Sequence, residues 1–177
     1  MSCSASGSTT QAPGGRGGAS VLYTFDNTPN DYFGNYNAVP VNSPVYESPG
    51  YNGRGQKILL RKNLTQYLTV PNHMSFYRQS LTIEAWIYPL ILYLTETASE
   101  VDNVIFAQTN SAIIGQYMWS LLRRGRNFGA FFANDVSGLT VVATKEWHHI
   151  AFTYDYATQI QTVYVNGIVG KLVDNHL

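Results

Sequence analysis

The sequence predicts an all-β protein whose strands form an antiparallel sandwich or barrel. Roughly ten or more short segments alternate apolar and polar residues with a period of two, and they follow one another at short intervals. No stretch keeps apolar residues three and four positions apart over three helical turns, so the crossover helices that parallel strands require are missing. The 13 Tyr, 8 Phe and 15 Gly residues suit strands that are joined by turns.

The composition divides the chain into a tail and one domain. Residues 1–20 are rich in Ser, Thr, Gly, Ala and Pro and nearly free of large apolar side chains, so we expect a flexible tail. Residues 21–177 are long enough for one domain with a substantial core. Basic and acidic residues both number 11, and this neutral balance argues against nucleic acid or an anionic membrane as a partner.

The sequence carries no signal for membrane insertion or for a disulfide. Its longest apolar run, Ile87–Leu94, contains Pro89 and is too short to span a bilayer. The N-terminus lacks the basic and apolar regions of a signal peptide, so either the protein is not secreted or the chain begins inside a longer precursor. Cys3 is the single cysteine, which excludes an internal disulfide.

The first predicted strand of the domain, Val21–Phe25, leads into a loop that is dense in side-chain oxygens. Oxygen ligands of this kind bind Ca²⁺, and the same residue types are also turn formers. The spacing fits no helix–loop–helix calcium loop, so turn formation is the interpretation that we favour. The four candidate oxygen ligands are Asp26, Asp31, Asn35 and Asn37.

The next part of the chain alternates turn signals with short strands. Residues 39–55 carry several Pro and Gly turn signals and are predicted to cross the molecule irregularly. Lys57–Leu60 and Tyr67–Val70 are predicted strands. Between them, Asn63 begins an Asn-Leu-Thr sequon, which makes it a glycosylation site only if the chain enters a secretory route.

The strongest single strand prediction is Leu81–Tyr88, because its apolar residues alternate throughout. The apolar face would point to the core, while Thr82, Glu84, Trp86 and Tyr88 share the opposite face. Aromatic rings on an open sheet face stack on sugars, although most aromatics in a sandwich fill the core. We therefore select Trp86, Glu84 and Tyr88 as candidate ligand-binding residues.

A series of further strands completes the predicted fold. Turns are predicted over Arg123–Asn127 and Asn134–Gly138, and Asn166-Gly167 favours a tight hairpin turn. The predicted strands are Asn103–Gln108, Tyr117–Leu122, Phe128–Ala133, Leu139–Thr144, Trp147–Tyr154, Gln161–Val165 and Ile168–Val173.

The common catalytic arrangements are missing. Glycoside hydrolysis needs two carboxylates that flank one bond, and Glu84 is alone on its strand. His148 and His149 are adjacent in a strand, so they point to opposite faces and cannot chelate one metal ion. The basic cluster Arg123, Arg124 and Arg126 is either a solvated turn, which we favour, or a contact for a sulfated glycan.

With the strands placed, several segments resemble the laminin-G-like domains of the concanavalin A-like lectin/glucanase superfamily. Residues 80–89, SLTIEAWIYP, resemble one strand motif of that family, and residues 146–155, EWHHIAFTYD, followed by VYVNG at 163–167, resemble its hairpin motif. Tyr23–Asp26 with Asp31, Gly34 and Asn35, and then Tyr46–Gly55, are similar to the segments that open the domain. The resemblance covers residues 21–167.

This resemblance implies a jelly roll of two stacked antiparallel sheets. The family continues beyond the Asn-Gly turn into further strands, so we expect a domain that is incomplete at its C-terminus. Some family members bind Ca²⁺ at the rim, and Asp31 is the position that the resemblance carries over as a metal ligand.

The function that the resemblance implies is recognition without catalysis. We expect an extracellular module that binds a glycan or a protein partner, with Ca²⁺ as a possible cofactor. A structural or adhesive module of a larger extracellular protein remains an open alternative. A glycoside hydrolase ranks last, because the acid pair is missing.

Overall fold

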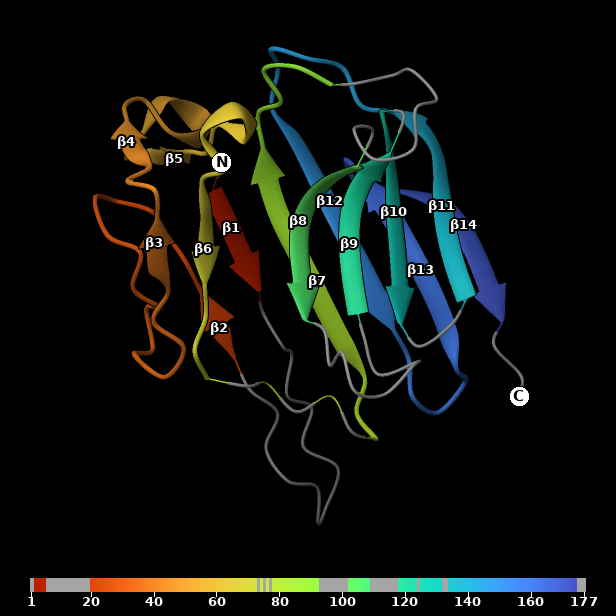
Figure 1. Cartoon of the computed structure of the whole chain (residues 1–177). Helices are drawn as coiled ribbons and strands as arrows, with labels where there is room; N and C mark the ends of the chain where they lie inside the picture. Colours follow the sequence, from red (N-terminus) through yellow and green to blue (C-terminus); the bar gives the residue numbers. More distant parts are fainter. Residues whose placement is uncertain are drawn as a thin grey trace.

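The computed structural model describes residues 2–5, 20–72, 74, 76, 78–92, 102–108, 118–123, 125–131 and 134–174. Within these ranges the chain is built almost entirely of β-strands, and all paired strands are antiparallel. A six-stranded sheet and a four-stranded sheet lie face to face, with β12 and β13 behind β8, β9 and β10 in the view of Figure 1. The prediction of an antiparallel β-sandwich is confirmed.

The six-stranded sheet contains the strands that the sequence marked most clearly. Its order is β14-β13-β12-β7-β1-β2. The turn between β13 and β14 has positive φ at both Asn166 (51°) and Gly167 (77°), as its Asn-Gly sequence predicts. The strands are β1 (Ser2–Ala5), β2 (Val21–Leu22), β7 (Leu81–Ile87), β12 (His148–Tyr154), β13 (Ile160–Val165) and β14 (Ile168–Asp174).

The four-stranded sheet, in the order β11-β10-β9-β8, corrects one sequence prediction. Residues 134–138, predicted as a turn, belong to a strand, because Asn134 pairs directly with Phe131 at the start of the hairpin. The strand lies at the sheet edge, where the polar Asp135 stays exposed to water. The strands are β8 (Asp102–Gln108), β9 (Met118–Arg123), β10 (Arg126–Phe131) and β11 (Asn134–Val141).

The main core fills the space between these two sheets. Phe152 on β12 is fully buried, and its ring lies so close to Gly129 on β10 that a Cβ atom at Gly129 would collide with it. Burying one large apolar side chain of this kind stabilises the fold by about 1.5–3 kcal/mol. The other large buried side chains between the sheets include Ile83, Ile87, Met118, Leu122, Val136, Ile150 and Val163.

A second, smaller core belongs to the residues that precede β7. The segment predicted as an irregular crossing contains two short strands, and Phe25, predicted to end a strand, has φ of 58°, which no strand adopts. These elements lie beside β1 and β2 (Figure 1) and bury Val21, Phe25 and Ile58. They are β3 (Val39–Val41), β4 (Val45–Glu47), β5 (Lys57–Leu59), β6 (Tyr67–Thr69) and the 3₁₀ turns η1 (Tyr51–Gly53) and η2 (Lys62–Leu64).

Strand β1 falls within the segment that we predicted as a flexible tail. Ser2 and Ser4 pair with Trp86 and Glu84 of β7, and β1 in turn pairs with β2. Strand pairing uses backbone groups, so an edge of β7 can accept a segment of small polar residues whose composition gives no strand signal. Residues 6–19 lie outside the described residues, so for them the flexible tail stays a prediction.

Candidate functional site

The two faces of β7 differ as the sequence predicts. Leu81, Ile83, Ala85 and Ile87 are buried against the four-stranded sheet, and the residues between them are partly exposed. Glu84 and Trp86 therefore lie on the outer face of the six-stranded sheet. Tyr88 follows the last residue of the strand and is also partly buried.

Four aromatic rings gather on this outer face, and they come from three separate segments. Tyr51 of η1 stacks on Trp86, with ring centroids 3.6 Å apart and planes 20° from parallel. Trp147, just before β12, meets Tyr51 edge-on at 5.8 Å and Tyr88 at 5.5 Å. The segments are brought together because β7 pairs with β12 while η1 lies over the end of β7.

A carboxylate and an imidazole complete the cluster. His149 is the cross-strand neighbour of Trp86, and the two rings lie 5.0 Å apart. The Nε2 atom of His149 lies 3.4 Å from Oε2 of Glu84, and both side chains keep a quarter to a third of their surface exposed (25% and 30%). We call the six residues Tyr51, Glu84, Trp86, Tyr88, Trp147 and His149 the aromatic face.

The aromatic face combines apolar rings with polar groups. Rings present apolar surface on which the carbon faces of a sugar can stack, while carboxylate, imidazole, phenol and indole groups can form hydrogen bonds with hydroxyls. The structure thus brings Glu84, Trp86 and Tyr88 together, as their shared strand implied. Tyr51 was missed, because it lies in a turn-rich segment that carries no signal for contact with β7.

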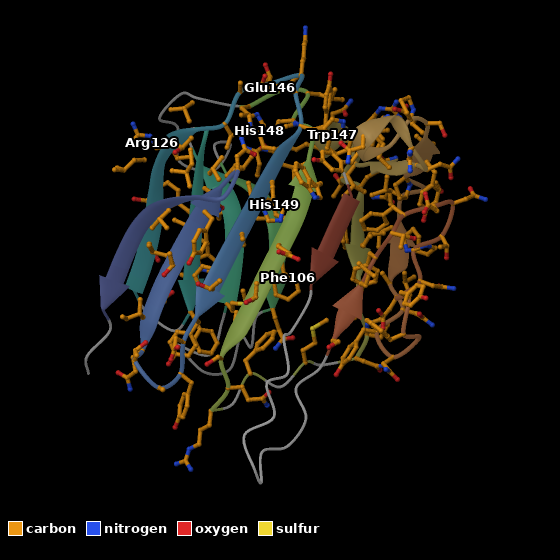
Figure 2. The ribbon with its side chains drawn as sticks, turned by 180° about the vertical axis from the view of Figure 1, so that it is seen from behind. Phe106, Arg126, Glu146, Trp147, His148 and His149 are labelled. Atoms are coloured by element: carbon orange, nitrogen blue, oxygen red, sulfur yellow. The ribbon has the colours of Figure 1, made fainter. Side chains whose placement is uncertain are left out.

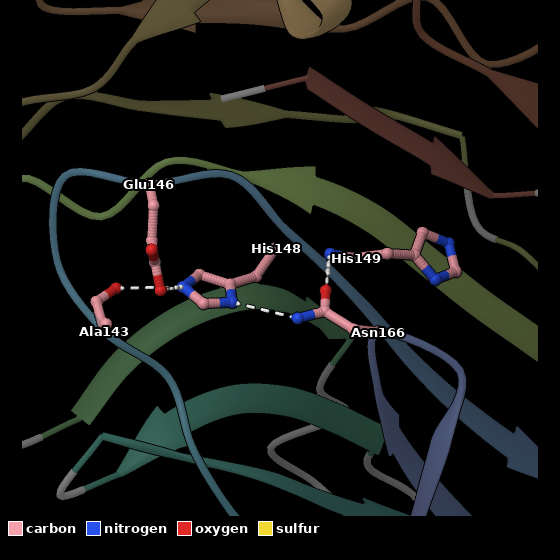
Figure 3. A network of polar contacts seen from close by, with 5 residues as sticks. All are labelled: Ala143, Glu146, His148, His149 and Asn166. Atoms are coloured by element: carbon pink, nitrogen blue, oxygen red, sulfur yellow. Dashed lines mark hydrogen bonds and ion pairs between the residues drawn. The ribbon is translucent and has the colours of Figure 1, made fainter.

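His148, the other histidine of the adjacent pair, points to the opposite face of the sheet from His149 and belongs to a buried network (Figures 2 and 3). His148 is only 5% exposed. Its Nε2 atom lies 3.2 Å from the carbonyl oxygen of Ala143 and 3.3 Å from Oε1 of Glu146, and its Nδ1 atom lies 3.3 Å from Nδ2 of Asn166. The expectation that His148 and His149 point to opposite faces is confirmed.

Asp31, the candidate calcium ligand, is buried in the loop after β2. Its Oδ1 atom accepts a hydrogen bond from the amide of Leu22 (2.9 Å), and Oδ2 accepts from the amides of Asn35 (3.1 Å) and Tyr36 (3.2 Å). These bonds give the carboxylate an organising role in the loop. Over the described ranges, no group of three or more His, Cys, Asp or Glu side chains is arranged to hold a metal ion. Calcium binding by Asp31 stays a prediction.

Two further predicted sites have an exposed residue in or beside a turn. Arg126 is exposed at the turn between β9 and β10, while Arg124 and the side chain of Arg123 lie outside the described residues. Asn63 of the sequon is exposed on η2, in a turn whose backbone is held by the side chain of Asn42, which donates to the carbonyl oxygens of Leu64 and Thr65. An exposed turn is accessible to a modifying enzyme, but the sequon itself stays a prediction.

Two tyrosines, the partly buried Tyr46 and the buried Tyr154, have a raised pKa. Burial raises the pKa of Tyr46, whose buried hydroxyl has no hydrogen-bond partner among the described residues. Burial likewise raises the pKa of Tyr154, with added repulsion from Tyr156 and Asp155. In the part of the chain that the structure describes, no helix has the length and apolar character needed to cross a membrane.

Comparison with known proteins places this arrangement in context. A family model described as "Concanavalin A-like lectin/glucanases superfamily" matches residues 62–171, which include all of β7, β12 and β13. No curated protein matches the chain. Among solved structures, the chain is similar to an S-layer domain-containing protein (residues 221–444) from Clostridium thermocellum ATCC 27405, with 21% identity over 86% of this chain and 71% of that chain and a TM-score of 0.44. That likeness is too distant to carry a function.

Proposed function

Because the chain belongs to the concanavalin A-like lectin/glucanase superfamily, we propose that it is a non-catalytic recognition module that binds a glycan at its aromatic face. The observation that carries the proposal is the gathering of Tyr51, Trp86, Tyr88 and Trp147 outside the core, with the Glu84–His149 pair beside Trp86. In a sandwich, rings that stabilise the fold alone are expected between the sheets, whereas these lie on the opposite side of β7.

The carboxylate content of the surface supports binding without catalysis. A glycosidase needs a second carboxyl group about 5–9.5 Å from the first. The outward positions of β7, β12 and β13 carry Thr82, Trp86, His149, Ala151, Thr153, Ile160, Thr162 and Tyr164 besides Glu84, and none of these is acidic. Glu84 instead has a histidine beside it. We therefore assign Glu84 to hydrogen bonding with a ligand.

A glycan array probed with the unchanged chain and two variants tests this function. Trp86→Ala removes the central ring of the aromatic face, and we expect glycan binding to weaken about tenfold or more, since aromatic contacts are worth about 0.5–1.5 kcal/mol beyond their area. Tyr156→Ala is the matched control, because Tyr156 is an exposed aromatic residue in the turn after β12. An array that stays blank for the unchanged chain, or equal binding by Trp86→Ala, rejects the proposal.

A second candidate function is a structural module of a larger extracellular protein. One observation favours it: Tyr51 already covers one side of the Trp86 ring, so the stack also joins the N-terminal elements to the sheet. Under this alternative, no glycan changes the melting temperature of the unchanged chain. Under the recognition function, a glycan that binds raises that melting temperature.

A further inference from the structure

Asn166, in the turn between β13 and β14, forms hydrogen bonds with both adjacent histidines (Figure 3). Its side-chain Oδ1 atom accepts a hydrogen bond from the backbone N–H of His149 at 2.8 Å. Its backbone N–H donates to the carbonyl oxygen of His149 at 2.7 Å. Its Nδ2 atom lies 3.3 Å from Nδ1 of the buried His148. One side chain thus connects the interior histidine with the histidine of the aromatic face.

These contacts determine where His148 carries its proton. The amide N–H of His149 can only donate, so the side-chain atom of Asn166 that faces it must be the oxygen. The amide nitrogen of Asn166 then faces His148, and because it can only donate, Nδ1 of His148 must accept. The proton of the neutral ring therefore sits on Nε2, where the carbonyl oxygen of Ala143 and the carboxylate of Glu146 can accept it.

A second proton on His148 would break this arrangement. It would place an N–H on Nδ1 directly against the donating amide group of Asn166. Asn166 cannot rotate to offer its oxygen without losing the bond to the amide of His149. The groups that face His148 are the neutral Asn166 from the β13–β14 turn, the carbonyl of Ala143, the carboxylate of Glu146, and, as its partner on β7, the apolar Ile87. Glu146 is mostly exposed (61%), so water screens its attraction for the charged ring.

We propose that Asn166 is a positioning residue for the aromatic face, and that protonation of His148 releases it. Asn166 holds His149 through that residue's backbone N–H and carbonyl oxygen, and it contacts the ring of His148, which directly follows Trp147 in the chain. His149 lies against Trp86, and Trp147 lies against Tyr51 and Tyr88. This inference rests on the proposed function only where ligand binding is concerned, because the proton position and the response of Trp147 need no ligand.

The Asn166→Asp variant separates positioning from simple support of the fold. An Asp side chain has about the same shape but offers acceptor oxygens to both the amide of His149 and a protonated Nδ1 of His148. The protonated form of His148 then gains an acceptor, so the pH at which the aromatic face responds should be higher in this variant than in the unchanged chain. Asn166→Ala, which has neither the acceptor oxygen nor the donating amide nitrogen, should remove the response of the aromatic face to pH.

The test is NMR of the ligand-free chain between about pH 8 and pH 5, the range in which histidine changes charge. Ring nitrogen shifts report which nitrogen of His148 is protonated, and the indole N–H of Trp147 reports the aromatic face, with Trp119 on β9 as the internal control. We expect a proton on Nε2 alone at pH 8, and a pH-dependent shift of Trp147 that moves upward in Asn166→Asp.

Two results would overturn the inference. One is a proton on Nδ1 of neutral His148, which the bonding of Asn166 does not permit. The other is a Trp147 shift that occurs at the same pH in Asn166→Asp as in the unchanged chain, because Asn166 would then only support the fold. A blank glycan array together with the expected NMR result would reject the proposed ligand and leave the positioning role of Asn166 intact.

Discussion

The sandwich and the N-terminal elements before β7 are stabilised by different kinds of contact. In the sandwich, every strand except the short β1 and β2 has six to eight residues, buried and outward side chains alternate along β7, and large apolar groups fill the space between the two sheets. From β3 to β6 the strands have three residues each. In these N-terminal elements, polar side chains hold the backbone. Asp31, in the loop before β3, accepts hydrogen bonds from the amides of three residues, and Gln66 forms hydrogen bonds with Arg61, Asn42 and Ser43.

This difference shows which kinds of contact can be predicted from a sequence. Period-two burial is repeated along each long strand, so every residue adds to the signal. A hydrogen bond between one side chain and a distant amide depends on a single residue and leaves no periodic trace. The aromatic face lies where the two kinds of region meet, with Tyr51 from the N-terminal elements resting on Trp86 of the sandwich.

The largest expected effect is in the sandwich core. Phe152→Ala removes a fully buried ring and leaves a cavity beside Gly129, so the free energy of unfolding should fall by about 3–5 kcal/mol. Chemical denaturation measures it. Val169→Ala is the control, because Val169 is half exposed (51%) and should change stability by less than about 0.5 kcal/mol. If Phe152→Ala lowered the free energy of unfolding by less than about 1 kcal/mol, instead of the expected loss of about 3–5 kcal/mol, this description of the core would be contradicted.

The second largest expected effect concerns the N-terminal elements, in a variant that keeps the side-chain volume. Asp31→Asn keeps the shape of the side chain but leaves amides without a charged acceptor, which should cost about 2 kcal/mol of stability. Thermal unfolding measures the change, and Glu47→Gln, at the weak 3.9 Å pair with Lys57, is the control. A calcium titration of the unchanged chain and of Asp31→Asn then separates the two roles of Asp31, since a calcium-dependent rise in melting temperature that the variant loses would make Asp31 a metal ligand.

A smaller effect is expected where the two regions join. Tyr51→Ala removes the ring that covers Trp86, so stability should fall by about 1 kcal/mol through lost aromatic stacking. Tryptophan fluorescence should shift to longer wavelength, because Trp86 becomes more exposed to water. Tyr51→Phe keeps the ring and should behave as the unchanged chain. If Tyr51→Ala left the emission unchanged, the stack would not form in solution.

The smallest effect belongs to the turn after β12. The amide of Thr158 above all, and then that of Ala157, holds the pKa of Asp155 below its usual range, although slight burial acts the other way. Because the folded pKa is depressed, the bonds contribute stability above the unfolded value of about 3.9, and this contribution is lost as pH falls through the folded pKa. Asp155→Asn should therefore lower stability slightly at pH 7, and this loss should disappear as the pH falls below the folded pKa of Asp155. NMR titration of the carboxyl group measures the pKa directly, and a value at or above the ordinary one would contradict the assignment.

Much of the sandwich could be predicted from the sequence because its strands are long and regular. The buried and outward faces of β7 and the hairpin of β12 and β13 follow directly from alternation. The start of β11 could not be predicted, because Asn134 and Asp135 are turn formers that pairing with β10 holds in a strand. Strand β1 was hidden for a related reason, since backbone pairing with β7 needs no apolar side chain.

The candidate site was predictable only in part. Glu84 and Trp86 share a face of β7, and Tyr88, the first residue after that strand, continues the same alternation, so their proximity follows from the period of two. The approach of Tyr51 depends on the path of the N-terminal elements, and the bonding of His148 depends on a turn that follows β13. Both are contacts between distant parts of the chain, which local patterns do not encode.

The most direct test of the account is NMR titration of the glycan selected by the array, followed through the indole N–H signals of the three tryptophans. Trp86 and Trp147 belong to the aromatic face, and Trp119 lies on β9 in the other sheet. Binding at the aromatic face predicts that the signals of Trp86 and Trp147 move together with saturation while Trp119 stays unchanged. Saturable movement of Trp119 alone would place the ligand on the other sheet and contradict the account.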